Sequence, residues 1–427
     1  MNAAIIISLL LVLMLTGMPI SISLGLTVLS FLFLFTQVPI ESVAMKLFTG
    51  IEKFEIMAIP FFILAGNFLT HGGVARRMIR FASSMVGHFH GGLGMAGVLA
   101  CALFAAISGS SPATVVAIGS ILLPAMIKAG FPNRFGAGII TTSGALGILI
   151  PPSIVMVMYS VATNTSVGAL FMAGVVPGIA LAFVLGAVTW HRARKFNYPR
   201  MPKAGFAKRM KAFRESAWGL LLIVIVMGGI YSGMFTPTEA AAMAAVYAFV
   251  IAVFIYKDLS IKDVPQVLLN SANMSAMLLY IITNAMLFSF IMTNENIPQA
   301  LANWMLGHGL GMITFLLACN VILLLAGNFM EPSSIVLIFA PILFPVAVKL
   351  GIDPVHFGIM MVVNMEVGMC HPPVGLNLYV ASGVTKMGIT ELTIAVWPWL
   401  LSMLGFLLLV TYWPGLSLWL PRMLGMM

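Results

Sequence analysis

The chain has 427 residues, of which 61% are hydrophobic and 8% are charged, and it carries a formal net charge of +9. Soluble domains average about 25% charged residues, so this composition excludes a water-soluble protein and indicates a chain whose solvent is lipid. The apolar runs are long and continuous rather than alternating in stretches of about ten residues, which favours membrane-spanning helices over an outer-membrane barrel.

The N-terminal apolar run covers residues 3–35 and contains a break at Gly17-Met18-Pro19. No basic region precedes it, so we expect a retained span rather than a cleaved signal peptide. Further spans are expected at residues 54–70, 94–127, 136–162 and 168–190.

The segment 94–127 contains the polar sequence SGSSP at residues 108–112. Each arm around this sequence is shorter than the roughly 20 residues of a full span. We therefore predict a re-entrant helical hairpin with a small, hydroxyl-rich tip. The next segment is interrupted at residues 144–152, which contain Gly147 and the pair Pro151-Pro152.

A basic stretch follows these spans. Residues 191–214 hold nine of the 21 Lys and Arg residues and no acid. The positive-inside rule places this stretch in the cytoplasm, which explains the charge without a nucleic-acid partner.

The second half of the chain carries seven further apolar segments, at residues 217–234, 238–256, 267–292, 297–328, 332–350, 355–384 and 393–420. Residues 312–350 predict a second hairpin, with its tip at residues 328–334. We thus expect an all-α membrane protein, a polytopic helical bundle of about 10–12 spans.

The two halves share a pattern. The pairs Pro124 and Pro345, Gly147 and Gly368, and Pro151 and Pro372 all differ by 221 positions. Repeats with interrupted helices at corresponding positions indicate a transporter binding site, because a break inside hydrocarbon frees backbone groups that another partner must satisfy. A single such break would more simply be a kink, but two matched pairs predict inverted repeats around a site.

Hard oxygen donors at these breaks suit Na⁺. The expected ligands are hydroxyl and carbonyl oxygens of Ser108, Ser110, Gly147, Ile150 and Pro152 in the first repeat, and of Gly327, Gly368, His371 and Pro373 in the second. Isolated Ser hydroxyls in membrane helices more often bond their own helix. The substrate contacts that we expect are Ser110, Ser111, Ser153, Glu331 and Asn377.

Acids within spans are costly and point to function. Glu331 lies in a predicted hairpin tip, where it could bind substrate hydroxyls, help to hold a cation or carry a proton. Glu366 precedes the second break and could serve either the site or helix packing. Glu239 follows Thr236 and Pro237, a sequence typical of a helix cap. His371 could titrate or contribute only its carbonyl.

Several kinds of chemistry have no counterpart in the sequence. We find no GxxxxGK[ST] phosphate cradle, no HExxH and no GxSxG. The cysteines Cys101, Cys319 and Cys370 suggest neither a disulfide framework nor a zinc site. We therefore expect no enzyme, and transport driven by an ion gradient or by a partner.

Seven motifs together resemble the large membrane subunit (DctM-like) of TRAP (tripartite ATP-independent periplasmic) transporters. They are IPFFILAG at 59–66, GGLG at 91–94, SGSSPAT at 108–114, IPPS at 150–153, FTPTEAAA at 235–242, GNFMEP at 327–332 and PPVGLN at 372–377. Cys370-His371 departs from the apolar and small polar residues expected there. The resemblance covers essentially the whole chain.

The resemblance implies import coupled to two or more Na⁺ ions by an elevator mechanism in the bacterial inner membrane. It implies two partners, a small membrane subunit (DctQ-like) and a soluble periplasmic substrate-binding protein. Family members carry sialic acid or C4-dicarboxylates. The alternatives are a stand-alone Na⁺/dicarboxylate or citrate symporter, and an ion channel.

We expect scaffold helices in residues 1–90 and 217–296, joined to the repeats by a basic cytoplasmic linker at 191–216. The first transport repeat is expected at 91–190, and the second at 297–427, with its broken helix at 366–373 and a C-terminal helix.

Overall fold

The computed structural model describes residues 2–36, 38–308 and 311–426, and all regular structure in these ranges is helical. This confirms the predicted all-α class. The helices before the first hairpin are α1 (Asn2–Leu15), α2 (Ile20–Phe35), α3 (Ile40–Thr49), the 3-10 turn η1 (Phe54–Met57), α4 (Ala58–His71) and α5 (Val74–Val86).

The first repeat forms the predicted hairpin and the interrupted helix. Its elements are α6 (Gly92–Ser108), α7 (Ser111–Lys128), α8 (Asn133–Gly144), the 3-10 turn η2 (Ala145–Ile148), α9 (Ile154–Thr163) and α10 (Val167–Lys195). Two features set the hairpin tip: Gly109 has a φ of +60°, and Pro112 lies in the first turn of α7, where a missing N–H leaves no helical bond unmade.

Three helices and one π-helical turn follow: α11 (Phe206–Tyr231), α12 (Pro237–Val250), η3 (Ile251–Ile255) and α13 (Val264–Asn294). The second repeat contains α14 (Ile297–Gly307), α15 (Met312–Gly327), α16 (Pro332–Lys349), α17 (Pro354–Cys370), α18 (Leu376–Thr385), α19 (Ile389–Tyr412) and α20 (Gly415–Met423).

Eight of the described helices are long and apolar enough to span a membrane by length and composition. Much of the remaining apolar sequence forms shorter helices on either side of a break, as in α1 and α2 or α17 and α18. Pro19 and the Pro372-Pro373 pair stand at these two breaks, because proline cannot donate the backbone bond that would continue a helix.

Two of the expected spans are each divided into two helices, and helices extend into both ends of the expected basic linker. The segment 297–328 is two helices, because Gly307 and Gly311 separate α14 from α15. The segment 393–420 is also two helices, divided at Trp413-Pro414. The basic linker is largely helical: α10 continues to Lys195 and α11 begins at Phe206, so only residues 196–205 lie between helices.

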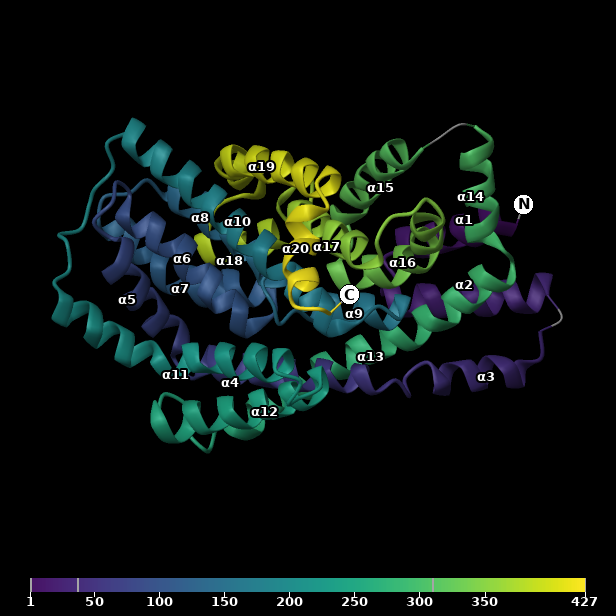
Figure 1. The fold of residues 1–427 in the computed structure, drawn as a ribbon, viewed down its shortest axis with the longest axis horizontal. Helices are drawn as coiled ribbons and strands as arrows, with labels where there is room; N and C mark the ends of the chain where they lie inside the picture. The colour runs from purple at the N-terminus through teal and green to yellow at the C-terminus, as the bar shows by residue number, and fades with distance from the viewer. Residues whose placement is uncertain (1, 37, 309–310, 427) are drawn as a thin grey trace.

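The two hairpins approach each other from opposite ends of the molecule. In Figure 1, α6 and α7 lie on the left and α15 and α16 on the right, so that their tips converge near the centre. The repeats also pack directly on each other, with α16 against α9, α18 against α7, and α19 against α8. Trp399 Nε1 donates to Thr189 Oγ1 (2.9 Å) and Tyr159 OH donates to the Pro354 carbonyl (2.7 Å), and each bond joins the two repeats.

A second group of helices covers one side of the repeats. In Figure 1, α3, α4, α11 and α12 form the lower layer. Within this group, α4 packs against α12, and α13 packs against both α2 and α4. The two hairpin tips therefore lie on one side of the candidate functional site described below, and α4 and α13 lie on the other.

Candidate functional site

The tip of the first hairpin is held by hydroxyl groups. Ser108 Oγ lies 2.9 Å from Thr114 Oγ1, which donates to the Ser110 carbonyl at 2.9 Å. Ser111 Oγ donates to the Ala145 carbonyl in η2 (2.8 Å) and so joins the tip to the interrupted helix. These bonds satisfy part of the backbone that the break exposes.

Close backbone approaches bring the first break against this tip. A Cβ on Gly147 would lie 2.6 Å from the Ser110 carbonyl oxygen, and one on Gly109 would lie 2.8 Å from the Pro152 carbonyl oxygen. Only glycine permits these distances. The structure thus places Ser110 against Gly147, and the tip residue Gly109 against Pro152. Ile150, also expected in this set, has its side chain against Gly178 of α10. Their role as Na⁺ ligands stays a prediction.

The second tip repeats this arrangement with different side chains. A Cβ on Gly327 would lie 2.9 Å from the Cα of Gly368, so α15 and α17 cross almost in backbone contact. With its amide nitrogen assigned from the hydrogen-bond network, Asn328 donates to the carbonyls of His371 (3.1 Å) and Pro372 (3.0 Å).

The two breaks differ in exposure. Pro152 is buried, whereas its counterpart Pro373 is exposed. A cation at the second break would compete with Asn328 for the His371 carbonyl. Cys370 is fully buried and its thiol donates to the Thr141 carbonyl of the first repeat (3.5 Å).

Both tips open into one cavity of about 430 Å³. Its lining comes from the first tip (Ser108, Gly109, Ser110, Ser111), the second tip (Glu331, Pro332, Ser333) and the covering helices α4 and α13. Among the expected substrate contacts, Ser110, Ser111 and Glu331 line the cavity.

The other two expected contacts do not line it. Ser153 is fully buried and caps α9 by accepting a bond from the Met156 N–H (3.4 Å). Asn377 is also fully buried, and its Nδ2 lies 3.9 Å from Cys370 Sγ. In this structure both residues support the breaks from behind the cavity.

The three acids occupy different surroundings. Glu331 takes the N-cap position of α16, and one of its carboxylate oxygens accepts a bond from Ser334 Oγ (3.1 Å). Glu366 is fully buried, and neither of its carboxylate oxygens has a hydrogen-bond partner among the described residues. Glu239 lies in the first turn of α12 and forms a capping box with Thr236, which confirms the predicted helix cap.

Polar residues of α4 were missed from the sequence. Asn67 and Thr70 line the cavity, and Asn67 Nδ2 donates to Ser271 Oγ of α13 (2.7 Å). The signal was an amide inside an apolar segment, which is costly unless it is paired. Nothing in the sequence indicated which hairpin this amide would face.

The residues present fit Na⁺ better than a transition metal. No group of three or more His, Cys, Asp or Glu residues converges in the described ranges. The donors at the first break are instead hydroxyl and carbonyl oxygens, from Ser108, Ser110 and Pro152, which are the ligands that interrupted helices offer to Na⁺.

Comparison with known proteins gives one family. The family model "Tripartite ATP-independent periplasmic transporter, DctM component" matches residues 7–416. The C4-dicarboxylate TRAP transporter large permease protein DctM of Rhodobacter capsulatus is 74% identical over 440 aligned positions, which cover 100% of both chains. The sialic acid TRAP transporter large permease protein SiaM of Vibrio cholerae serotype O1 is 36% identical over 411 positions, which cover 96% of both chains.

Among solved structures, the YdaH transporter of Alcanivorax borkumensis has a similar fold, with a TM-score of 0.65 and 16% sequence identity. The match covers 91% of this chain and 89% of that one. At this identity the likeness concerns the fold alone.

Proposed function

We propose that this chain is a large permease subunit that imports a C4-dicarboxylate with Na⁺. The chain belongs to the DctM family of tripartite ATP-independent periplasmic transporter components. Membership of a transporter family also confirms the expectation that the chain is not an enzyme. The observation that carries the proposal is the cavity of about 430 Å³ in which the tips of both repeats meet.

The cavity suits a small carboxylate by its shape and its dipoles. The N-termini of α7 and α16 begin at the two tips, and helix N-termini favour anions. Hydroxyl groups of Ser110 and Ser333 line the same space. The substrate class follows the relative that is 74% identical rather than the sialic acid permease at 36%.

Charge balance supports the coupling to Na⁺. No Lys or Arg lines the cavity among the described residues, so a dicarboxylate needs positive charge from elsewhere, and bound Na⁺ ions would supply it. Oxygen atoms of Ser108, Ser110, Gly147, Ile150 and Pro152 would hold one ion. Those of Gly327, Gly368, His371 and Pro373 would hold another.

The division of the helices supports the proposal of an elevator motion. Residues 91–190 and 297–427 carry the site, and residues 1–90 and 217–296 supply α4 and α13, which cover it. We propose that the first group moves against the second. The cavity is lined by Thr70 near the C-terminal end of α4. That end leads into α5, where Arg80 pairs with Glu215 beside the basic segment (3.6 Å). We therefore assign this structure to the inward-facing state by the positive-inside rule.

The proposed assembly contains a small membrane subunit and a periplasmic substrate-binding protein, in the bacterial inner membrane. The test is uptake of radiolabelled succinate into proteoliposomes, with and without a Na⁺ gradient, the small subunit and the binding protein. We expect uptake only when all three are present. Uptake without the binding protein would indicate a stand-alone symporter, and flux that does not saturate would indicate a channel.

Variants of the tips test the site itself. Glu331→Gln and Ser110→Ala should each lower uptake at least tenfold while leaving the protein folded and inserted. The matched controls are Glu41→Gln in exposed α3 and Ser120→Ala on the exposed face of α7, outside the cavity. Wild-type uptake by Glu331→Gln would remove this acid from the mechanism.

A further inference from the structure

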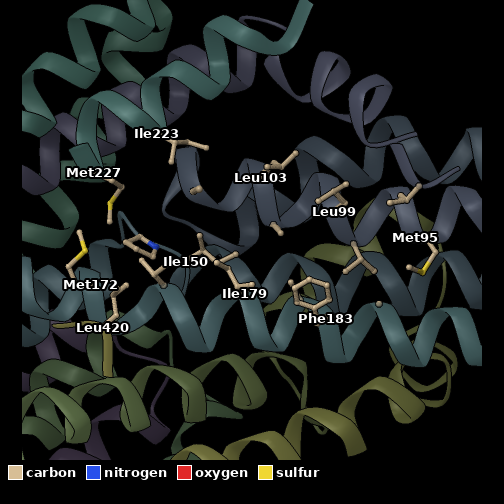
Figure 2. Close-up of a pocket in the computed structure, with 18 of the residues that line it drawn as sticks. Met95, Leu99, Leu103, Ile150, Met172, Ile179, Phe183, Ile223, Met227 and Leu420 are labelled. Atoms are coloured by element: carbon tan, nitrogen blue, oxygen red, sulfur yellow. The ribbon is translucent and has the colours of Figure 1, made fainter. Parts of the chain in front are cut away.

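A second and larger cavity lies outside the cavity at the hairpin tips, and Ile150 and Pro151 of the first break line part of it. It is a groove of about 1140 Å³, open along one side, between α6, α10 and α11. In Figure 2, Leu99 and Leu103 of α6 face Ile179 and Phe183 of α10 across it. The side chains that line this groove, which we call the α10 groove, are almost entirely aliphatic, aromatic or thioether groups.

The α10 groove runs through the depth of the membrane. It follows α10 from Met172 to Trp190, a helical length of about 27 Å at 1.5 Å per residue, against a hydrocarbon core of about 30 Å. An apolar cavity does not attract water, and at this depth the groove opens toward the hydrocarbon core of the bilayer. We therefore expect hydrocarbon chains to fill the groove.

Unpaired positive charge stands at one end of the groove. Trp190 lines this end, and the guanidinium of Arg194 lies 5.4 Å from its ring centre. The Met201 N–H donates to the Gly87 carbonyl (3.0 Å), which brings the neighbouring Arg200 to the turn that carries His90 and the groove residue Phe89. Neither arginine takes part in the ion pairs found in the described ranges.

This combination matches a phospholipid. An anionic headgroup pairs with arginine through charge-assisted hydrogen bonds, and acyl chains fill an apolar groove that begins beside it. We propose that the α10 groove binds an anionic glycerophospholipid of the cytoplasmic leaflet, with its phosphate at His90, Arg194 and Arg200 and its acyl chains along α6 and α10.

A lipid also suits the position of the groove, and this point rests on the proposed elevator motion. The groove lies where α6 and α10 of the transport repeat meet α11 of the covering layer. Fluid acyl chains keep both surfaces covered when one slides past the other. A protein helix docked in the groove would instead contact both bodies and resist their movement.

The first test is native mass spectrometry of the delipidated full chain, titrated with phosphatidylglycerol or with phosphatidylcholine. We expect preferential binding of phosphatidylglycerol. Replacing Arg194 and Arg200 together by Gln should weaken it at least fivefold. Lys208→Gln with Lys211→Gln, two exposed residues at the start of α11 that lie 12 or more positions before the groove residue Ile223, should leave it unchanged. An equal loss of phosphatidylglycerol binding in both double variants would show that only the overall positive charge of the segment matters, and would overturn the proposal.

Filling the groove provides a second test. Ala182→Trp places an indole in the groove and should reduce binding of both lipids, whereas Val246→Trp on the exposed face of α12 should not. If Ala182→Trp does not fold, the arginine variants still test whether the groove binds an anionic lipid. A photo-crosslinking residue at Phe183, which is 75% exposed, should capture lipid in native membranes, and capture of a protein there would refute lipid occupancy. None of these readouts measures transport, so they can fail independently of the proposed function.

Discussion

The side chain of Lys53 links the two groups of helices on the side opposite the basic segment. Its Nζ donates to the Val161 carbonyl and to Asn164 Oδ1, both at 2.6 Å, at the C-terminal end of α9. The segment that carries Lys53 is tied to α12 by the bond from Thr238 Oγ1 to the Phe54 carbonyl (3.0 Å). An elevator motion would have to break the contacts of Lys53, so we expect Lys53 to stabilise the state seen here.

The magnitude follows from these two bonds. A hydrogen bond that involves a charged group contributes about 1.5–3 kcal/mol. Lys53 is partly exposed, so water replaces much of each bond, and together they should contribute about 2 kcal/mol. Since 1.4 kcal/mol is a factor of ten, Lys53→Met should shift the equilibrium between the two states by roughly 30-fold.

Thiol labelling measures this shift. The three native cysteines are buried, so a cysteine introduced at Val116, which lines the tip cavity and is 45% exposed, gives a clean signal. A membrane-impermeant maleimide is applied to right-side-out and to inverted vesicles. In Lys53→Met the ratio of periplasmic to cytoplasmic labelling should rise at least tenfold.

Lys46→Met is the matched control, because Lys46 lies over the Phe290 ring (5.3 Å) within the covering helices. An unchanged ratio in Lys53→Met, or an equal change in Lys46→Met, would refute the reasoning.

Three further predictions concern stability, each measured as a thermal melt of the purified protein. Gly368→Ala should destabilise it by about 1–3 kcal/mol through overpacking, because the new Cβ would lie 3.0 Å from the Gly327 Cα, whereas Gly383→Ala, with nothing within 4 Å, should be neutral or stabilising. Thr236→Ala should cost about 1 kcal/mol by removing the cap of α12, and no loss would contradict the capping role. Asn320 accepts a bond from Asn364 Nδ2 (2.9 Å) and donates one to Thr411 Oγ1 (2.9 Å). Asn320→Leu and Asn364→Leu should therefore each destabilise the protein by about 1–3 kcal/mol. The double variant should lose less stability than the sum of the two single losses. Strict additivity would show that the bond between the two side chains contributes nothing.

The breaks and the hairpins could be predicted because their causes are local. Pro112, Gly147 and Pro151 interrupt a helix wherever it packs, and their counterparts at Pro332, Gly368 and Pro372 recur at nearly constant spacing. The helix cap at Thr236 could be predicted for the same reason, since a capping box needs only residues three positions apart.

The remaining features depend on tertiary packing. Hydropathy carries no direction, so it predicts one apolar segment over residues 297–328, although the predicted second hairpin does begin at Met312, the first residue of α15. The cap made by Ser153 could not be separated from a substrate contact, because both need a hydroxyl beside a break. Likewise, the position of Asn67 over the tips depends on how α4 packs across the repeats.

The contacts between the two repeats also set the order of events during biosynthesis. Thr141 and Cys370, which bond across the repeats, are 229 positions apart. At a synthesis rate of about 5–20 residues per second, the first hairpin would wait about 10–50 seconds for its partner. During that time its short arms and polar tip stand in the bilayer without the second repeat that covers them. The nascent first half should therefore depend on contacts with the insertion machinery that keep the polar tip away from lipid. A chain truncated before α15 should be degraded by membrane quality control.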